Sequence, residues 1–200
     1  MEERKHYEVE VWGIALDPFN QSPIVVLRNK ENPKELLPIW IGHNEASGIM
    51  MVLNDIDFSR PLTYELIKNM LRSLGATVER VEIRDIKDGT FFASLFLKDA
   101  LGNIVEVDSR PSDAINIALR TNAPIFVAKH VMDTSKVNLD ETIAQLLEEK
   151  ENKENPPEEK IQSQDQKEEE SAEIDQDLKA WLENLKPEDF EKYGKSKGGN

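Results

Sequence analysis

Residues 77–119 read TVERVEIRDIKDGTFFASLFLKDALGNIVEVDSRPSDAINIAL, and this stretch decides the fold of the chain. Apolar and polar residues alternate on both sides of Asp88-Gly89, a dipeptide that is typical of tight β-hairpins. A second turn at Gly102-Asn103 leads into a third alternating segment, which ends at Asp108. The stretch therefore predicts three consecutive antiparallel strands, followed by a helix.

The helix that follows is predicted to begin at Ser109-Arg110-Pro111, where a proline suits the first helical position. Its expected buried stripe consists of Ala114, Ile115, Ala118 and Leu119. Asn122, which shortly precedes Pro124, is expected to end the helix.

Further strands and helices are predicted on both sides of this stretch. The strand segments are 7–16, 23–27, 36–41 and 125–128. Helical spacing predicts helices over 45–53, over 61–74 with Gly75 as the stop, and over 139–147. Strands in runs with helices between them predict an α+β fold, with a mixed or antiparallel sheet of about seven strands and three to four helices.

Charge divides the chain into segments. Residues 1–147 contain 16 basic and 22 acidic residues, a net charge of −6, whereas residues 148–177 contain 4 basic and 13 acidic residues, a net charge of −9, and no aromatic residue. Such a segment buries too little apolar surface to offset the loss of chain entropy. We therefore expect one folded domain over 1–147 and a disordered acidic linker over 148–177.

The last part of the chain regains an apolar pattern. Residues 178–194 place apolar side chains at helical spacing, at Leu178, Trp181, Leu182 and Leu185. An isolated helix of this length is marginal in water, so we expect this short helical segment to pack on the domain or on a protein partner. Residues 195–200 are expected to form a disordered end.

The sequence excludes several classes of site and predicts where the protein resides. The chain contains no cysteine, which excludes disulfides, thiolate metal sites and cysteine nucleophiles. It also lacks the motifs GxxxxGK[ST], GxGxxG and HExxH. No apolar run approaches the ~20 residues of a membrane helix, and the N-terminus leads into an alternating strand, so a cytoplasmic protein is expected.

The tripeptide Ser-Arg-Pro occurs twice, at 59–61 and at 109–111, and each copy is expected to open a helix. An arginine at a helix start faces the positive end of the helix dipole, so a negative group should lie nearby. For Arg110 that group is either internal, from Asp108 and Asp113, or an external anion such as a phosphate. Two such helix starts facing each other would place Arg60 and Arg110 on one phosphodiester.

Polar chemistry is concentrated where the third strand of the meander ends, at Asp108, Ser109, Arg110, Ser112 and Asp113. Carboxylates in this arrangement could bind a divalent cation such as Mg²⁺ or act as a base toward water, while arginine stabilises charge on a phosphoryl group. Glu45, in the first turn of an expected helix, is a candidate third carboxylate. Its alternative role is that of a surface acid favoured by the helix dipole.

Three motifs in this order resemble those of the bifunctional nuclease family, also known as a domain of unknown function. They are Leu37-Pro38-Ile39-Trp40-Ile41-Gly42 with Glu45-Ala46, Arg60-Pro61-Leu62-Thr63, and Asp108-Ser109-Arg110-Pro111-Ser112-Asp113-Ala114. The resemblance, here to a bacterial member, implies an α+β fold, a homodimer and, as in plant members, nuclease activity toward DNA and RNA. Residue by residue, it places the family's polar signature on Glu45, Arg60, Thr63, Asp108, Arg110, Ser112 and Asp113.

Two hypotheses follow. The first is a nuclease or phosphodiesterase in which Asp108, Asp113 and Glu45 are catalytic or hold a cation, and in which phosphate is bound by Arg60, Arg110, Thr63, Ser109 and Ser112. The second is a non-enzymatic regulatory domain whose polar cluster binds a small anion or lines a dimer interface. The acidic tail favours the second hypothesis. The net charge of −6 over residues 1–147 argues against a strong nuclease, because nucleic-acid binders usually carry a basic stripe.

Overall fold

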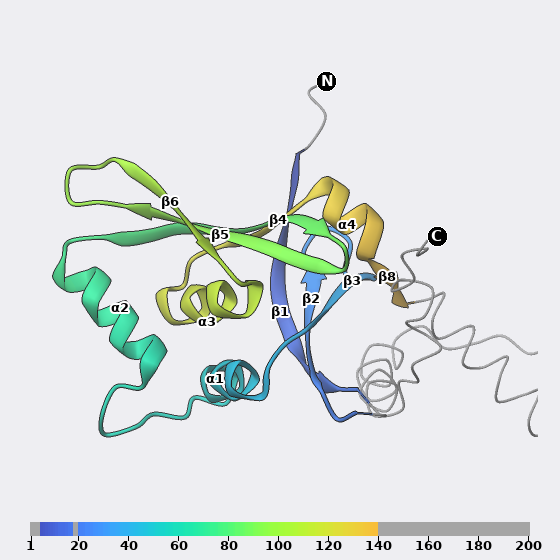
Figure 1. The fold of residues 1–200 in the computed structure, drawn as a ribbon, viewed down its shortest axis with the longest axis horizontal. Coiled ribbons are helices and arrows are strands. Elements are labelled where there is room, and N and C mark those ends of the chain that lie inside the picture. Colours follow the sequence, from blue (N-terminus) through green and yellow to red (C-terminus); the bar gives the residue numbers. More distant parts are fainter. Residues whose placement is uncertain (1–4, 18–19, 140–200) are drawn as a thin grey trace, which may run out of the picture.

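The computed structural model describes residues 5–17 and 20–139. In chain order its elements are β1 (His6–Leu16), β2 (Pro23–Asn29), β3 (Glu35–Trp40), α1 (His43–Leu53), α2 (Thr63–Ser73), β4 (Thr77–Lys87), β5 (Thr90–Lys98), β6 (Ile104–Ser109), α3 (Pro111–Thr121), β7 (Ile125–Ala128), α4 (Lys129–Ser135) and β8 (Val137–Asn138) (Figure 1). None of these helices combines the length and the apolar character needed to cross a membrane.

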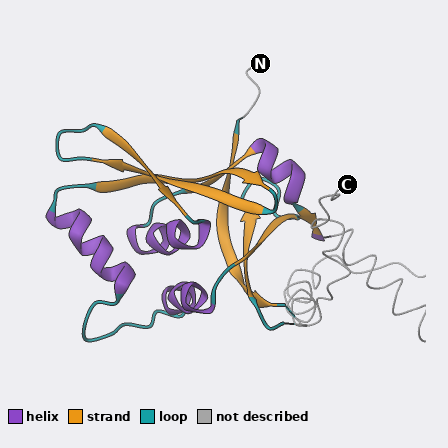
Figure 2. Cartoon of the chain, viewed as in Figure 1, coloured by secondary structure: helices purple, strands orange, loops and turns teal. Residues whose placement is uncertain are grey.

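The strands form a single sheet in the order β6-β5-β4-β7-β1-β2-β3-β8. Neighbouring strands are antiparallel except β4 and β7, which are parallel. Two meanders, β1 to β3 and β4 to β6, are thus joined through β7 (Figure 2). The predicted α+β fold with a mixed sheet is confirmed, with eight described strands and four described helices.

The hairpin between β4 and β5 has the predicted turn. Asp88 and Gly89 both adopt positive φ angles, 49° and 73°, and Lys87 pairs with Thr90 across the turn. Two consecutive residues with positive φ make a turn whose twist matches that of the strands, and Asp-Gly tolerates this conformation well. The local sequence is therefore sufficient to explain the hairpin.

The two Ser-Arg-Pro copies differ in structure. At the second copy, Arg110 is the N-cap residue and Pro111 the first residue of α3, as predicted. At the first copy the prediction was wrong, because α2 begins only at Thr63 and its N-cap is Leu62, which has extended dihedral angles. A residue before a proline is pushed out of the helical region. At the first copy Leu62, which follows the proline, is extended as well, so Arg60 lies in the loop that precedes α2.

Two described elements were not predicted, namely α4 and β8. Both are short, with seven and two residues, and a seven-residue segment offers too little periodicity to be distinguished from a loop. The helix predicted over 139–147 extends beyond the last described residue, Leu139. The acidic linker and the segment 178–194 also lie outside the described residues.

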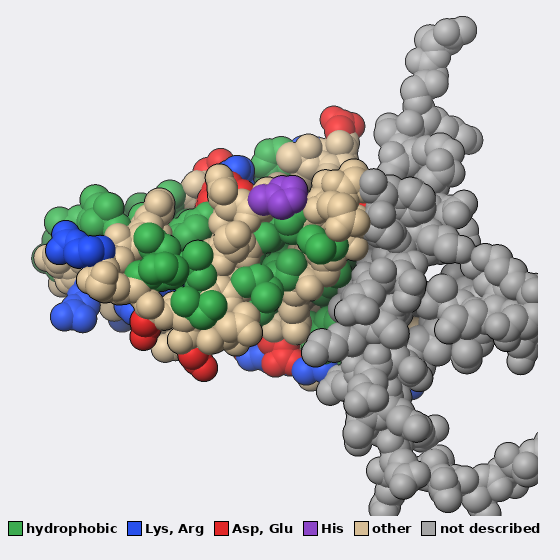
Figure 3. Space-filling view, turned by 90° about the horizontal axis from the view of Figure 1, so that it is seen from below, with side chains coloured by type: hydrophobic (Ala, Val, Ile, Leu, Met, Phe, Trp, Pro, Cys, Tyr) green, Lys and Arg blue, Asp and Glu red, His purple; other side chains and the backbone are tan. Residues whose placement is uncertain are grey.

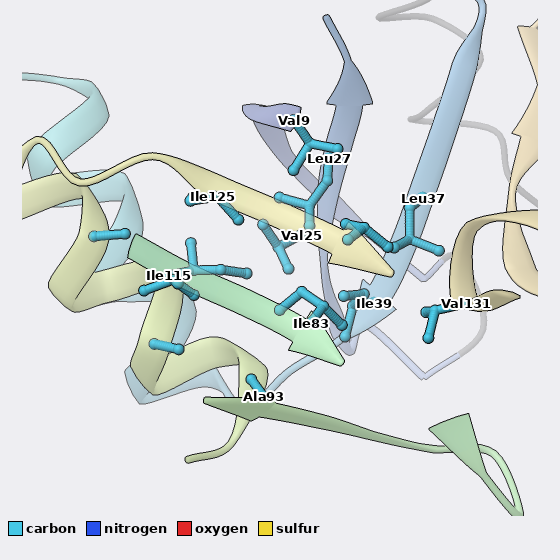
Figure 4. Close-up of a cluster of buried hydrophobic side chains, with 14 of the residues drawn as sticks. Val9, Val25, Leu27, Leu37, Ile39, Ile83, Ala93, Ile115, Ile125 and Val131 are labelled. Atoms are coloured by element: carbon cyan, nitrogen blue, oxygen red, sulfur yellow. The ribbon is translucent and has the colours of Figure 1, made fainter. Parts of the chain in front are cut away.

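The core lies between the sheet and the helices. The β strands contribute side chains such as Val25, Leu27, Ile83 and Ala93, and these pack against Ile115 of α3 (Figure 4). Ala114, Ile115 and Ala118 are fully or almost fully buried, which confirms most of the predicted stripe of α3. The same burial fixes α3 against the sheet and thereby fixes the position of Arg110 at its start.

Helix α2 is amphipathic, but its apolar side is not covered by the rest of the described chain. It contains no buried residue, and Leu66, Met70 and Leu74 expose half or more of their surface. Figure 3 views the molecule from below the orientation of Figure 1, the side on which α1 and α2 lie, and shows hydrophobic side chains gathered there. The apolar stripe of α2 therefore lies largely at the surface.

Candidate active site

The first residues of α3 meet α1 and α2 at a cavity of about 730 Å³. Gly48 of α1 allows a close approach, because a β-carbon there would lie 2.5 Å from Oδ1 of Asn116 and 3.0 Å from Cε2 of Tyr64. The residues that line the cavity come from all three helices and the preceding loop: Asn44, Glu45, Gly48, Met51, Pro61, Leu62, Thr63, Tyr64, Leu66, Ile67, Arg110, Asp113 and Arg120.

Arg110 is held at this cavity by two carboxylates. Its Nε donates to Oδ2 of Asp113 at 2.6 Å, while its Nη2 donates to Oδ1 of Asp113 at 3.0 Å and to Oε1 of Glu45 at 2.8 Å. The hydrogen bonds from Arg110 to Asp113, followed by those to Glu45, raise the pKa of the guanidinium above its ordinary value. The side chain of Arg110 is 66% exposed and that of Glu45 is 16% exposed, so the guanidinium lies nearer to the solvent than the carboxylate that it binds.

The structure therefore brings together three of the eight predicted site residues. The prediction that Arg110 pairs with an acid of its own chain is correct for Asp113. The other acid that binds Arg110, Glu45, lies 65 residues earlier in the chain. Nη1 of Arg110 makes no hydrogen bond to any described residue, and this exposed nitrogen can bind an anion.

Tyr64 is a fourth member of the cluster, and the sequence reasoning missed it. Its hydroxyl donates to Oδ1 of Asp113 at 2.7 Å. Burial, and then the hydrogen bond to Asp113, raise the pKa of Tyr64, so the hydroxyl stays protonated and remains a donor to the carboxylate. The signal for Tyr64 was its place in the first turn of α2, next to Thr63, which the family motif includes.

A buried arginine connects the three helices behind the cluster. The side chain of Arg120 is only 4% exposed, and its Nη2 donates to the carbonyl oxygen of Gly48 at 2.9 Å. It also pairs with Glu65 at 2.5 Å and donates to the carbonyl and side-chain oxygens of Asn116 at 3.1 and 3.0 Å. Asn116 in turn donates to the carbonyl oxygen of Glu45 at 2.9 Å.

This network holds α1 and α2 on α3 and thereby fixes Glu45 and Tyr64 relative to Arg110. Burial by itself raises the pKa of Glu65, but the hydrogen bond and charge of Arg120, with backbone hydrogen bonds, lower it overall. In the sequence, Arg120 is an ordinary basic residue in the last turn of a helix. Nothing in the pattern indicated that its side chain is buried and connects three helices.

Asp108 lies apart from the cluster. Adjacent side chains of a strand point to opposite faces of the sheet, so Asp108 and Ser109 of β6 diverge. Asp108 is 76% exposed and accepts a hydrogen bond at 2.6 Å from Nη2 of Arg84 on β4. The sequence predicted that Asp108 and Asp113 lie in one acidic site, but the structure does not bring these two residues together.

The remaining predicted residues are distributed around the site. Thr63 lines the cavity as the first residue of α2. Arg60 lies in the preceding loop, and none of the ion pairs between described residues includes it. The hydroxyl of Ser109 donates to the carbonyl oxygen of Arg110 at 3.0 Å, and Ser112 is buried.

The acidic residues do not form a metal-binding set. Within residues 5–17 and 20–139, no three histidine or acidic side chains are grouped so that they could hold a metal ion. Glu45 and Asp113, the two acids that do converge, both bind the guanidinium of Arg110, a cation that occupies the place a metal would need. The described residues therefore do not fit the divalent cation that the sequence left open as one alternative.

A second cavity of about 420 Å³ lies on the other side of Arg110. It is lined by the end of β3, by the β4–β5 turn and by the start of α3, through the residues Ser22, Ile39, Trp40, Ile41, Gly42, Gly89, Thr90, Phe91, Arg110, Pro111 and Ser112. Arg110 is thus the residue that lines both cavities.

Residues 25–140 match the family described as the bifunctional nuclease domain. An uncharacterized protein of Mycobacterium tuberculosis is 38% identical over 125 residues, which are 62% of this chain and 73% of that protein. Bifunctional nuclease 1 of Arabidopsis thaliana is 34% identical over 122 residues, 60% of this chain. The match covers only 37% of the plant protein, so the chain corresponds to about a third of that relative.

Proposed function

Because the chain belongs to the bifunctional nuclease domain family, we propose that it hydrolyses phosphodiester bonds in DNA and RNA at the cavity between α1, α2 and α3. One observation carries the proposal, which is the convergence of Glu45, Tyr64, Arg110 and Asp113 at the mouth of that cavity. The plant relatives named bifunctional nucleases support the substrate class.

Arg110 is the phosphate-binding group in this proposal. Its exposed guanidinium keeps Nη1 available, and an arginine positioned by carboxylates is pre-organised to receive a phosphate oxygen. The same positive charge stabilises the negative charge that develops on the phosphoryl oxygens when water attacks. Thr63 lies at the same cavity and can donate its hydroxyl hydrogen to a phosphate oxygen.

Glu45 is the general base. Both oxygens of Asp113 already accept hydrogen bonds, from Arg110 and Tyr64, whereas Oε2 of Glu45 accepts none from any described residue. Glu45 takes the proton of the attacking water, the oxygen of that water bonds to phosphorus, and the bond from phosphorus to the leaving sugar oxygen breaks. The leaving oxygen takes a proton from solvent. Asp113 and Tyr64 position Arg110 and take no proton.

The test is the hydrolysis of single-stranded DNA and of RNA by the purified full chain and its Glu45→Gln variant, with and without EDTA. Loss of a general base reduces rates by about 10²- to 10⁴-fold, so the variant should cleave at least a hundredfold more slowly. Asp108→Asn is the matched control, because Asp108 pairs with Arg84 away from the cavity. Equal cleavage by the parent and Glu45→Gln would refute the proposal and indicate a contaminating nuclease.

The second candidate function, a non-enzymatic dimeric regulatory domain, is favoured by a specific observation. Eight large apolar side chains of α1, α2 and their connecting loop expose 40–74% of their surface: Met50, Leu53, Ile56, Phe58, Leu62, Leu66, Met70 and Leu74. We call them the α1–α2 face. Exposed apolar side chains gathered in one patch mark a protein–protein interface, and a stable interface takes ~800 Å² from each partner.

A second copy of the chain is the occupant that we propose for this face. Leu66→Glu places a charge in its middle and should convert a dimer into a monomer of 22.8 kDa, measured by sedimentation equilibrium. Leu101→Glu is the control, because Leu101 is 88% exposed but lies in the β5–β6 turn. A parent chain that already sediments at the monomer mass would rule out the dimer. A dimer without nuclease activity would favour the regulatory function.

A further inference from the structure

The motif of residues 37–42, which contains Trp40, takes no part in the proposed chemistry. Several of its residues line the second cavity. Trp40 is the last residue of β3, and 41% of its surface is exposed although it is a large aromatic side chain. The residues before and after it, Ile39 and Ile41, pack in or against the core. The alternation of the strand therefore places the indole ring outside the core, where it lines the second cavity.

The indole ring is held in a defined orientation. Its Nε1 donates to Oδ2 of Asp17 at 3.1 Å, and Asp17 is itself buried. In the sheet, Trp40 pairs with Ile24 of β2. A ring held along its polar edge and in its backbone register has a fixed orientation, and 41% of Trp40 is exposed beside the cavity, as a stacking platform requires.

The cavity beside Trp40 combines an aromatic surface with a cation. Phe91 is a second aromatic residue of its lining, and Arg110 supplies the positive charge. The hydroxyl groups of Ser22, Thr90 and Ser112 lie in the same lining, while Gly42 and Gly89 add no side-chain bulk. Its volume of about 420 Å³ is within the range of roughly 300–1,000 Å³ typical of small-ligand pockets.

We propose that this cavity binds an unpaired nucleobase, stacked on Trp40, of a single strand whose neighbouring phosphate lies on Arg110. The inference rests on the proposed function and specifies its substrate class as single-stranded nucleic acid. Bases within a duplex are covered on both faces by their neighbours, so a stacking platform is accessible only to an unpaired base. Stacking does not depend on net charge, so it supplies affinity that a domain of net charge −6 does not obtain from long-range attraction.

The arrangement also explains why one arginine borders both cavities. A strand that places a base beside Trp40 and its phosphate at Arg110 presents that phosphate directly to Glu45, which lies 2.8 Å from the guanidinium. The second cavity then selects the strand and the first performs the reaction. Trp40 is a binding residue in this scheme and takes no part in proton transfer.

The experiment measures binding of a fluorescently labelled single-stranded phosphorothioate oligonucleotide to the full chain by anisotropy. Trp40→Ala should weaken binding by roughly 5- to 150-fold, the range measured for loss of one stacked base. Trp40→Phe keeps an aromatic surface and should restore most of the affinity. Trp12→Ala is the control, because Trp12 is a second partly buried tryptophan that does not line the second cavity. The same sequence as a duplex should bind at least tenfold more weakly.

The proposal is overturned if Trp40→Ala binds as tightly as the parent, if the duplex binds as tightly as the single strand, or if the parent binds neither. Far-UV circular dichroism and thermal melting of each variant separate a loss of binding from a loss of fold. Failure of the nuclease function gives a different result, since Trp40-dependent binding without cleavage leaves the nucleobase site in place. Cleavage that depends on Glu45 but not on Trp40 leaves the nuclease and removes the nucleobase site.

Discussion

Nη2 of Arg110 lies 2.8 Å from Oε1 of Glu45, and these two residues are 65 positions apart in the chain. Arg110 caps α3 and Glu45 lies in the first turn of α1, so the contact depends on how the two helices pack. Asn116 contributes to that packing by donating to the carbonyl oxygen of Glu45. The candidate active site is therefore a product of the contact between α1 and α3.

Replacing Arg110 with lysine should disable the site with little effect on the fold. A lysine retains the charge, but its single nitrogen cannot reproduce the fork that contacts Asp113 and Glu45. We expect cleavage and binding of single-stranded nucleic acid to fall at least tenfold, and the melting temperature to change little because the side chain is mostly exposed. Arg84→Lys, at the exposed pair with Asp108, is the control; comparable losses in both variants would contradict the assignment.

Replacing Gly48 with alanine should destabilise the packing of the helices. The added methyl group would lie 2.5 Å from Oδ1 of Asn116, so that either Asn116 rotates away from its hydrogen bond with Arg120 or α1 moves away from α3. Overpacking of this kind costs about 1–3 kcal/mol, which urea unfolding would measure. Gly13→Ala is the matched control, because nothing lies within 4 Å of the position its methyl group would take. Similar unfolding free energies for the two variants would mean that α1 is free to shift.

The pair of Glu65 and Arg120 should make stability depend on acid pH. The pKa of Glu65 in the folded state lies below its ordinary value of 4.5. The stabilising contribution is therefore complete above about pH 4.5 and is lost as the pH falls through the lowered pKa. The melting temperatures of the parent and of Glu65→Gln should differ most at neutral pH and converge below pH 4.5.

Glu79→Gln is the control for that experiment. Glu79 is 43% exposed, and its carboxylate is 3.9 Å from Lys98, a geometry that contributes little to stability. The difference in melting temperature between this variant and the parent should be small at every pH. A gap between the parent and Glu65→Gln that stays constant from pH 7 to pH 3 would argue against a structural ion pair.

Removal of the acidic segment should alter the binding of nucleic acid. Residues 148–177 carry a net charge of −9, and such a segment can compete with phosphate for Arg110. Truncation after Leu147 should tighten binding to nucleic acid at low salt, and the gain should vanish at high salt because charges are screened. Truncation after Asp177 keeps the linker and is the control. Unchanged affinity after the longer truncation would exclude competition by this segment.

Local sequence was sufficient where a structure depends on neighbouring residues. The Asp88-Gly89 turn has the positive φ angles that its residue types permit, and Arg110-Pro111 opens α3 as its pattern predicts. The same reasoning failed at Arg60-Pro61, where Leu62 is still extended and α2 begins only at Thr63. An identical tripeptide therefore has two conformations, because the helix start also depends on the loop that leads to it.

The sequence was less informative about which face of a helix is buried and which distant residues contact each other. The sequence predicted the apolar stripe of α2, but amphipathic spacing reveals only that a helix has an apolar side. It does not reveal whether that side packs against its own chain or against another molecule, and here Leu66 and Met70 remain exposed. The role of Arg120 was missed for the same reason, since its partners come from three helices.

The sequence by itself determined the α+β class, the order of most strands and helices, and the residue types available at the start of α3. These properties follow from turn chemistry and periodicity, which act over a few residues. Only the tertiary structure decided that Glu45 and Tyr64 join Arg110 and Asp113, while Asp108 faces Arg84. The physical reason is that strand alternation sends neighbours to opposite faces, whereas helix packing brings distant residues to one cavity.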